Sequence, residues 1–393
     1  MGLKVRASDK MSRTKSPLGN IEDRLIRIPK ELRDKTGFKT GTFLRLKNKE
    51  GKDIALQVTH AYKENAEVES RCAYVSEDIY KELDLKAIQI LDPAADILIG
   101  CDPEFFLIDN QTNRTVSASY FFPHYGQVGS DMGLAELRPR PATDPRSLLN
   151  NISALLHRAS EHLKERKSYR NRDVSMIAAS SYQGASAGFH IHFGLPKVLL
   201  AHSDGAYNLR VKIVNVLDFY IGVPSMLPEG DDDCYRRSLY NNYGKPGDFR
   251  SESITLEYRV PGGHLLRHPL LTMGLLSISA LVIKDILTRF KAQTNGYTDL
   301  EKLRKPSAVR KLYPNLPHPP DIYEIVTRKE CGPAIKMCTE KILPDLTKMI
   351  GYKNNEKYVT QYFQYIVDCL GDKRKRYGSN IEQNWRRLFY NAG

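Results

Sequence analysis

The chain has 393 residues and carries a formal net charge of +13 at pH 7, from 59 Lys and Arg against 46 Asp and Glu. Hydrophobic residues make up 41% and charged residues 27%, which excludes a wholly disordered or fibrous chain and predicts a globular protein of two or more domains. The positive charge favours anionic partners such as nucleotides, phosphates or acidic polymers, but it does not choose among them.

The amino-terminal residues 1–21 are basic and polar, and they lack the apolar stretch of a signal peptide. We expect them to form a flexible basic tail that can contact a polyanion. The six cysteines are scattered without a Cys-x-x-Cys pair, which argues against a zinc knuckle or a thioredoxin-like motif. Sparse cysteines in a long chain are typical of a reducing compartment, so the expected location is the cytoplasm.

Residues 22–95 are predicted to form a small β-rich domain from two copies of one pattern. Each copy reads as a strand, a short helix and a second strand, over 27–46 and again over 73–91, at an offset of about 47 residues. The repeat predicts a small β-barrel with pseudo-twofold symmetry, which resembles double-psi and swapped-hairpin barrels such as those of AbrB-type transcription regulators. A structural or partner-docking role and DNA binding both stay open for it, and residues 92–96 are expected to act as a hinge.

The second predicted domain, residues 96–295, combines alternating strands with amphipathic helices. Apolar residues that recur every three or four positions predict helices over 148–163, 210–223 and 269–290. The last of these holds the uncharged stretch Leu270–Ile283, which is too short to cross a bilayer and is therefore expected to be a buried core helix. Strands and helices in this order predict an α+β fold in which helices pack on one face of a sheet.

The carboxyl-terminal region, residues 296–393, is basic and begins with a proline-rich segment. Helical patterns follow at 321–329, 333–351 and 355–370, and a cationic run lies at 373–376. Two interpretations stay open for this helical region: a solvated cap on the sheet, or a surface that docks a polyanion or nucleic acid.

Four short segments of the second domain place charged side chains on strand-like stretches. They are Asp-Pro-Glu at 102–104, Gly-Leu-Ala-Glu-Leu-Arg at 133–138, His-Ile-His at 190–192 and Leu-Glu-Tyr-Arg at 256–259. Residues two apart in a strand share a face, so each segment offers its charged groups to one side of the sheet. Because buried charge must be paired or bound to metal, the pattern predicts a site that handles metal ions and phosphates.

Carboxylates with this spacing repel one another unless cations lie between them, and Mg²⁺ and Mn²⁺ are the natural choice because both prefer oxygen ligands. Glu104 and Glu136 are predicted ligands on this argument, and Asp131 is a candidate ligand or substrate contact. At least one of His190 and His192 is expected to bind a metal or a phosphate, although the His-Ile-His segment lacks the third histidine of a catalytic zinc triad. Turn capping, cross-strand ion pairs and core hydrogen bonds are the plainer explanations that stay open.

Arginines lie in the same domain, at Arg236, Arg237, Arg250 and Arg259. Guanidinium groups bind phosphate oxygens in pairs, and the loop 241–252, rich in glycine and asparagine, could fold over a nucleotide. The chain has neither a Walker G-x-x-x-x-G-K-[ST] motif nor a Rossmann G-x-G-x-x-G motif, so a nucleotide site must be of another kind.

In their order along the chain, the stretches DPEFFL, ELRPRP, HIHFG and YGKPGDFR followed by LEYRVP resemble one group of carboxylate–amine ligases. This is the phage-encoded COOH–NH2 ligase type 2 group, first grouped around phiEco32-like phages, within the glutamine synthetase superfamily. The resemblance covers about residues 97–290 and leaves the barrel and the helical tail outside it. It implies a glutamine synthetase-like antiparallel sheet with helices on one face.

The resemblance also implies the chemistry: ATP phosphorylates a carboxylate, and an amine attacks the acyl phosphate to form an amide, with Mg²⁺ or Mn²⁺ as cofactor. The implied metal ligands are Asp102, Glu104, Glu136, His192 and Glu257, the implied nucleotide contacts are His190, Arg237, Arg250 and Arg259, and the implied catalytic groups at the phosphoryl are Arg236, Arg250 and Arg259.

Two other functions stay open from the sequence. One is a phosphotransferase on the same sheet, which would yield a stable phosphorylated product in place of an amide. The other is a nucleic-acid-binding or assembly protein that uses the barrel and the basic tail. For the ligase, the expected partners are a carboxylate and an amine of unknown identity, with a homo-oligomer possible and no membrane contact.

Overall fold

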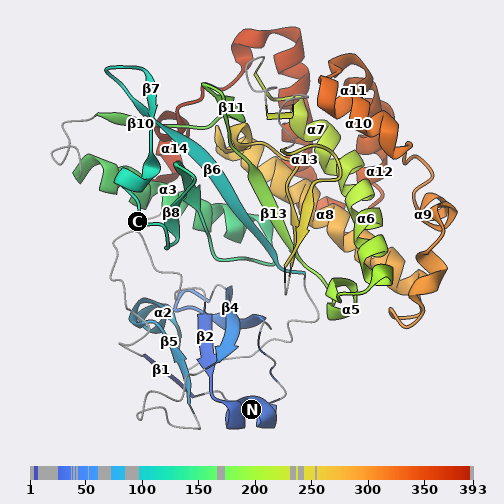
Figure 1. Ribbon diagram of the computed structural model, residues 1–393, viewed down its shortest axis with the longest axis horizontal. Coiled ribbons are helices and arrows are strands. Elements are labelled where there is room, and N and C mark those ends of the chain that lie inside the picture. Colours follow the sequence, from blue (N-terminus) through green and yellow to red (C-terminus); the bar gives the residue numbers. More distant parts are fainter. Residues whose placement is uncertain are drawn as a thin grey trace.

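The computed structural model describes most of the chain, which forms two parts (Figure 1), each with its own main hydrophobic core. One core belongs to the amino-terminal part, and the other is shared by everything from the central sheet to the carboxyl-terminal helices. The described residues are 4–7, 25–36, 38, 40, 43–51, 53–60, 72–84, 97–165, 173–230, 236–237, 243–252 and 255–389.

The amino-terminal part is a five-stranded sheet with two short helices. In sheet order its strands are β1 (Val5–Ala7), β5 (Ala73–Val75), β2 (Leu25–Ile28), β4 (Asp53–His60) and β3 (Phe43–Lys47), and its helices are α1 (Lys30–Thr36) and α2 (Glu77–Glu82). Strand β1 pairs in parallel with β5, and β4 pairs in parallel with β2. Strands β2 and β5 pair antiparallel at Arg27 and Tyr74.

The first two elements of each predicted copy are present, because β2 is followed by α1 and β5 is followed by α2, and the two strands pair at Arg27 and Tyr74. The expected strand at 87–91 and the hinge at 92–96 lie outside the described residues. Closure of the sheet into a barrel therefore stays a prediction.

The predicted flexible tail at 1–21 needs a correction. Residues Val5–Ala7 form strand β1, which pairs in parallel with β5, and Val5 is only 6% exposed. The apolar side chain of Val5 fills the small amino-terminal core, so this segment belongs to the sheet in spite of its basic neighbours. The rest of the predicted tail, apart from Lys4, lies outside the described residues.

The second part is built on an antiparallel sheet in the order β14-β15-β13-β6-β9-β8. Its long central strand β6 also pairs with β7 and β10 near its end, and a small hairpin, β11 and β12, stands apart. The strands are β6 (Ile99–Asp109), β7 (Arg114–Val116), β8 (Val128–Asp131), β9 (Leu134–Leu137), β10 (Val174–Ile177), β11 (Ser181–Tyr182), β12 (Ala185–Ser186), β13 (Phe189–Gly194), β14 (Phe249–Ser251) and β15 (Thr255–Tyr258).

Alternation along these strands separates an apolar face from a charged one. Phe105 on β6, Ile191 on β13 and Leu256 on β15 are fully buried in the main core. Their neighbours in the sequence, such as Glu104 and Glu257, point to the opposite face. The sheet is therefore covered by helices where its side chains are apolar and carries charged groups where they are not.

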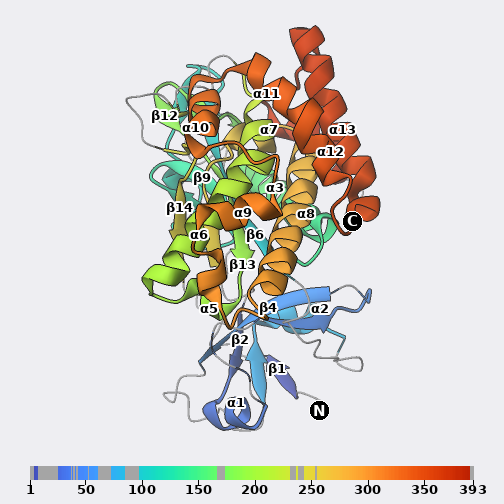
Figure 2. The same cartoon turned by 90° about the vertical axis from the view of Figure 1, so that its right-hand side faces the viewer.

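Helices α3 (Pro145–Glu165), α6 (Asp204–Leu217) and α13 (Tyr352–Gly371) pack around the long helix α8 (Pro269–Gln293), and Figures 1 and 2 show α8 and α13 side by side. Among the described residues, α8 is the one helix long and apolar enough to cross a membrane, yet 83% of its most apolar window is buried inside the protein. The expectation of a buried core helix is confirmed.

Shorter helices complete this part and refine the predicted ones. The helix expected at 333–351 is divided by a π-helical turn. The helix expected at 210–223 begins earlier, at Asp204, as α6, and it continues into another π-helical turn. The bounds are η3 (Ala118–Tyr120), α5 (Lys197–Leu200), η4 (Asp218–Gly222), α7 (Val223–Met226), η6 (Gly263–Leu266), η7 (Leu300–Leu303), α9 (Pro306–Leu312), α10 (Pro319–Arg328), α11 (Cys331–Met337), η8 (Cys338–Ile342), α12 (Leu343–Leu346), η9 (Lys373–Lys375) and α14 (Ile381–Phe389).

The carboxyl-terminal helices share the main core with the sheet. Tyr362 on α13 and Trp385 on α14 are fully buried there, and the Trp385 indole Nε1 donates to the Leu266 carbonyl at 2.8 Å. This region is therefore a structural layer of the sheet domain and not a separate unit.

Candidate functional site

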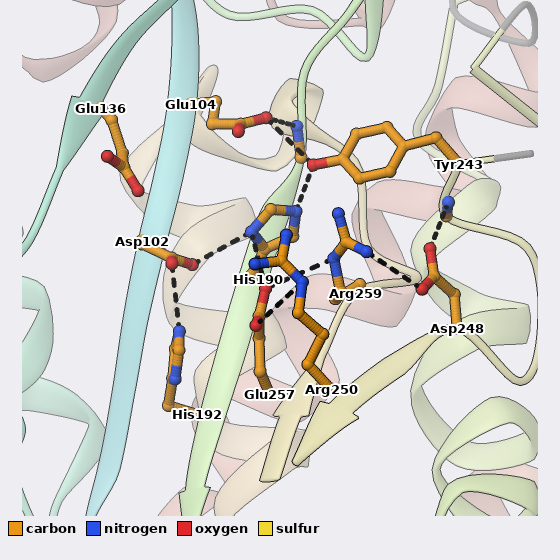
Figure 3. A network of polar contacts seen from close by, with 12 residues as sticks. Asp102, Glu104, Glu136, His190, His192, Tyr243, Asp248, Arg250, Glu257 and Arg259 are labelled. Atoms are coloured by element: carbon orange, nitrogen blue, oxygen red, sulfur yellow. Dashed lines mark hydrogen bonds and ion pairs between the residues drawn. The ribbon is translucent and has the colours of Figure 1, made fainter. Parts of the chain in front are cut away.

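Strand register brings the predicted residues together on the charged face of the sheet (Figure 3). His190 lies opposite Asp102 across the β6–β13 pair, and Glu257 lies opposite His192 across the β13–β15 pair. On the other side of β6, Glu104 lies opposite Glu136 on β9. Four segments far apart in the sequence thus meet in one row of side chains.

Asp102, His192 and Glu257 form a cluster in which each residue offers one ligand atom and these atoms lie within 4.8 Å of one another. His192 Nε2 lies 3.1 Å from Asp102 Oδ2. The second histidine stands between the two carboxylates, because His190 Nδ1 lies 3.3 Å from Asp102 Oδ1 and 3.5 Å from Glu257 Oε1. Two carboxylates and an imidazole at this spacing could hold a divalent metal ion.

Glu104 and Glu136 lie beside this cluster but have protein partners of their own. The Glu104 carboxylate accepts from the Gly188 backbone N–H at 2.6 Å and from the Tyr243 hydroxyl at 3.2 Å. Glu136 forms an ion pair with Arg138. The predicted ligand set is thus divided into a cluster of three and a neighbouring carboxylate pair.

Electrostatics at the cluster differ between its two carboxylates. Burial by itself raises the pKa of Asp102, but the imidazoles of His192 and His190 hold that pKa well below its usual range. For Glu257, burial and the nearby Asp102 raise the pKa, against the opposing effect of both histidines and Arg250. The site therefore keeps one carboxylate firmly ionised and favours a cation beside the other.

Arg250 and Arg259 flank Glu257 from β14 and the end of β15. Arg250 Nε lies 3.6 Å from Glu257 Oε2, and its side chain is 57% exposed, whereas Glu257 is 3% exposed. Arg259 Nε lies 3.3 Å from Glu257 Oε1 and its Nη1 lies 3.4 Å from Asp248 Oδ1. Burial lowers the pKa of Arg259, but the charges of Asp248, Tyr243 and Glu257 outweigh this and raise it.

Arg236 and Arg237 are almost completely buried and are engaged by the protein itself. Arg236 donates through both Nη atoms, each at 2.7 Å, to the backbone carbonyls of Arg259 and Val260. Arg237 forms an ion pair with the buried Glu229. These positions fit a role in holding the site together better than direct contact with a phosphate.

Asp131 ends strand β8 and is half-buried beside a tight turn at Met132 and Gly133, which both have positive φ. Burial lowers the pKa of the nearby Arg138, while Asp102 and Asp131 oppose that effect. Asp131 therefore lies close to the carboxylate row without belonging to the cluster of three.

Sequence reasoning assigned no role to Tyr243, Asp248 or Asp218. The Tyr243 hydroxyl contacts His190 Nε2 as well as Glu104, and Asp248 receives the Gly244 backbone N–H at 2.8 Å. The sequence signals for these residues are the glycine-rich loop and its YGKPGDFR stretch, which contain Tyr243 and Asp248 but indicate no partner for either. Their partners come from other strands and helices, so spacing along the chain cannot reveal them.

Comparison with solved structures finds several distant resemblances. A bifunctional glutathione synthetase from Pasteurella multocida is 11% identical, with 75% of this chain and 52% of that chain covered and a TM-score of 0.38. The ligase PafA in complex with the prokaryotic ubiquitin-like protein Pup is 11% identical, with 74% of each chain covered and a TM-score of 0.39. A GmaS/ADP complex is 11% identical, with 76% and 94% covered and a TM-score of 0.30.

The chain spans about half the length of the glutathione synthetase. No curated protein matches the chain. A family match is found for residues 99–302, slightly more than half of the sequence, and these residues include the whole row of charged side chains. The protein belongs to the phage phiEco32-like COOH.NH2 ligase-type 2 family.

Proposed function

We propose that the protein is an ATP-dependent ligase that joins a carboxylate to an amine through an acyl phosphate, with divalent metal ions at the charged face of the sheet. The observation that carries the proposal is the cluster of Asp102, His192 and Glu257 beside the guanidinium groups of Arg250 and Arg259. A metal-binding cluster next to paired arginines is what transfer of a phosphoryl group requires.

The residues present fit Mg²⁺ or Mn²⁺. Asp102 Oδ1 is buried and, among the described residues, accepts no hydrogen bond, although it lies 3.3 Å from His190 Nδ1. A buried carboxylate oxygen without a donor is costly unless a cation satisfies it. Asp102, His192 and Glu257 would hold one ion, and Glu104 with Glu136 are the nearest carboxylates for another. A bound divalent ion would neutralise the charge on the phosphate oxygens.

The proposed reaction has two steps. A carboxylate oxygen of the acid attacks the γ-phosphorus of ATP, the bond to the β–γ bridging oxygen breaks, and ADP leaves. The amine nitrogen then attacks the carbonyl carbon of the acyl phosphate, inorganic phosphate leaves, and the nitrogen loses a proton to give the amide.

Arginines of this chain would stabilise the charge that develops during the transfer. The exposed guanidinium of Arg250 can reach a phosphate oxygen, and Arg259 lies between Glu257 and Asp248, which fix its orientation. His190 is placed to contact the nucleotide or to complete the metal site. We assign Arg236 and Arg237 a positioning role, since they are buried and bound to protein groups.

The experiment that tests the proposal is release of ADP with Mg²⁺ or Mn²⁺ across a panel of acids and amines, with the product identified by mass spectrometry. We expect ADP release that depends on both substrates, and an amide product. Glu257→Gln should lower turnover by ~10²-fold or more, because it removes a ligand charge from a buried site.

Glu356→Gln is the matched control, because Glu356 is an exposed carboxylate on helix α13. It should keep turnover within about twofold of the wild type. A stable phosphorylated acid without amide would instead identify a phosphotransferase. Turnover of Glu257→Gln equal to that of the control would refute the site assignment.

A further inference from the structure

We propose that Tyr243 is a positioning residue of the metal site, which holds His190 and Glu104 in the orientation from which they serve the ligand cluster. This inference rests on the proposed function, because it assumes that the cluster binds a divalent metal ion. It adds a residue that neither the sequence motifs nor the family match assigns.

The Tyr243 hydroxyl links the two parts of the divided ligand set. It donates to Glu104 Oε2 at 3.2 Å and contacts His190 Nε2 (Figure 3). With Nε2 engaged by the hydroxyl, the opposite ring nitrogen Nδ1 faces Asp102 and Glu257, at 3.3 and 3.5 Å. One hydroxyl thus fixes the rotation of the imidazole and the direction of a neighbouring carboxylate. Groups that orient metal ligands in this way raise metal affinity.

Two arginines contact the Tyr243 ring, which gives the hydroxyl a defined place. The guanidinium carbons of Arg236 and Arg259 lie 4.3 and 4.8 Å from the ring centroid, in cation–π contact. Arg236 is itself fixed by its two hydrogen bonds to backbone carbonyls at the end of β15. His190 meets the ring edge-on, at an interplanar angle of 84°.

Two glycines leave the space that this arrangement needs. A Cβ at Gly188 would overlap His190 Nε2 and would lie 2.8 Å from the Tyr243 hydroxyl oxygen. A Cβ at Gly244, which has a φ of +70°, would overlap the guanidinium of Arg236. The backbone therefore approaches the phenol, the imidazole and the guanidinium more closely than a side chain would allow.

The loop that follows Tyr243 is tied to the same site. The Gly244 N–H donates to Asp248 Oδ2 and the Gly247 N–H donates to Asp218 Oδ2, both at 2.8 Å. Asp248 in turn contacts Arg259, which contacts Glu257. Tyr243 is thus fixed by its ring and by its loop, so loss of the hydroxyl alone would leave the backbone in place.

The test is Mn²⁺ binding to Tyr243→Phe, measured without ATP by titration while the electron paramagnetic resonance signal of free Mn²⁺ is followed. Phenylalanine keeps the ring that the two guanidinium groups contact and removes only the hydroxyl. We expect the dissociation constant for Mn²⁺ to rise ~10- to 100-fold with a melting temperature close to that of the wild type. The matched control is Tyr297→Phe, which removes a half-buried hydroxyl that donates to the Leu287 carbonyl at 2.8 Å, and it should leave Mn²⁺ affinity unchanged.

Gly188→Ala tests the same contact in a second way. Its Cβ would overlap His190 Nε2 and lie 2.8 Å from the Tyr243 hydroxyl oxygen, so it would disturb the contact between these two groups. It should weaken Mn²⁺ binding to a similar degree. Glu257→Gln, measured in parallel, separates the inference from the proposed function. If Glu257→Gln loses Mn²⁺ binding while Tyr243→Phe binds like the wild type, the role of Tyr243 is overturned and the metal site stands. If Glu257→Gln also binds like the wild type, both are overturned.

Discussion

At the scale of single residues, each buried charge of the candidate site is matched by a particular neighbour. Asp102 has the two histidines, and Glu257 has Arg250 and Arg259. Such local pairing is required because an unpaired charge in a buried place costs several kcal/mol. The overall charge of +13 contributes little to this balance, since exposed charges are screened by solvent and salt.

Arg259→Lys tests the geometry of this pairing. Lysine keeps the positive charge but loses the planar fork that contacts Glu257 and Asp248 and stacks on Tyr243. We expect kcat/KM for amide formation to fall ~10²-fold. Arg374→Lys, at a side chain that is 91% exposed, is the control and should leave kcat/KM unchanged. Equal values for the two variants would mean that charge alone suffices at Arg259.

Asp218→Asn tests a buried carboxylate under the 243–250 loop. Burial raises the pKa of Asp218 from 3.8 to about 7, although hydrogen bonds from Tyr258 and Gly247 oppose the rise. Because the folded protein binds the proton more tightly than the unfolded chain, this contribution to stability is complete below pH 3.8 and is lost as pH rises through about 7.

Asparagine does not titrate, so the stability of Asp218→Asn relative to the wild type should increase as the pH rises from 4.5 to 8. The increase should be about 1.4 kcal/mol for each pH unit up to the raised pKa of about 7. Urea denaturation midpoints over this range measure it. The exposed Asp321→Asn serves as control, with a relative midpoint that stays flat. A flat profile for Asp218→Asn would contradict the burial argument.

At the scale of elements, the site depends on strand register and on one helix pair behind the sheet. A slip of one residue in β13 would turn His190 and His192 toward the core and bring Ile191 to the charged face. The helix α8 supports the sheet from the apolar side, and α13 lies against it. Close packing between these two helices is possible because Gly274 faces Tyr362.

Gly274→Ala should therefore destabilise the protein although alanine favours helices by about 1 kcal/mol over glycine. The new Cβ would lie 2.5 Å from Tyr362 atoms on α13 and would force the helices apart. We expect a loss of ~1–3 kcal/mol, read from denaturation midpoints. Gly205→Ala in helix α6 is the control, since nothing lies within 4 Å of its Cβ, and it should be neutral or slightly stabilising. The same effect for both would rule out close packing at Gly274.

At the scale of the whole molecule, the protein has two cores of unequal importance to the site. The sheet, α3, α8 and the carboxyl-terminal helices share one core, and the amino-terminal sheet has its own. Arg140 and Glu82 form an ion pair at 2.8 Å between the two parts. The main core contains residues from both sides of the predicted boundary near residue 296, and the amino-terminal core lies before residue 97.

Two truncations test this division. A chain that begins at residue 97 should keep the melting temperature of the main core within a few degrees, because its core is complete. A chain that ends at residue 350 should fail to fold cooperatively, because it removes Tyr362 and Trp385 from that core and exposes the apolar side of α8. Circular dichroism melts of both proteins measure this. Cooperative unfolding of the second protein would show that the carboxyl-terminal helices are only a cap.

The sequence by itself determined which residues share a face. Alternation along 102–104, 190–192 and 256–259 separated the charged row from the core, because the period of a strand is fixed at two residues. Helical periodicity likewise located α3 and α8. The ordered motifs were enough to identify the ligase family, which the match over residues 99–302 confirms.

Only the tertiary structure decided which charged groups are partners. It showed that Arg236 and Arg237 are buried and bound to protein groups, that Val5 belongs to a sheet, and that Tyr243 bridges Glu104 and His190. These outcomes depend on strand pairings and loop contacts, which for Tyr243 join residues 53 and 139 positions apart in the sequence. Local spacing carries no information about such contacts, because they are set by how separate elements pack against one another.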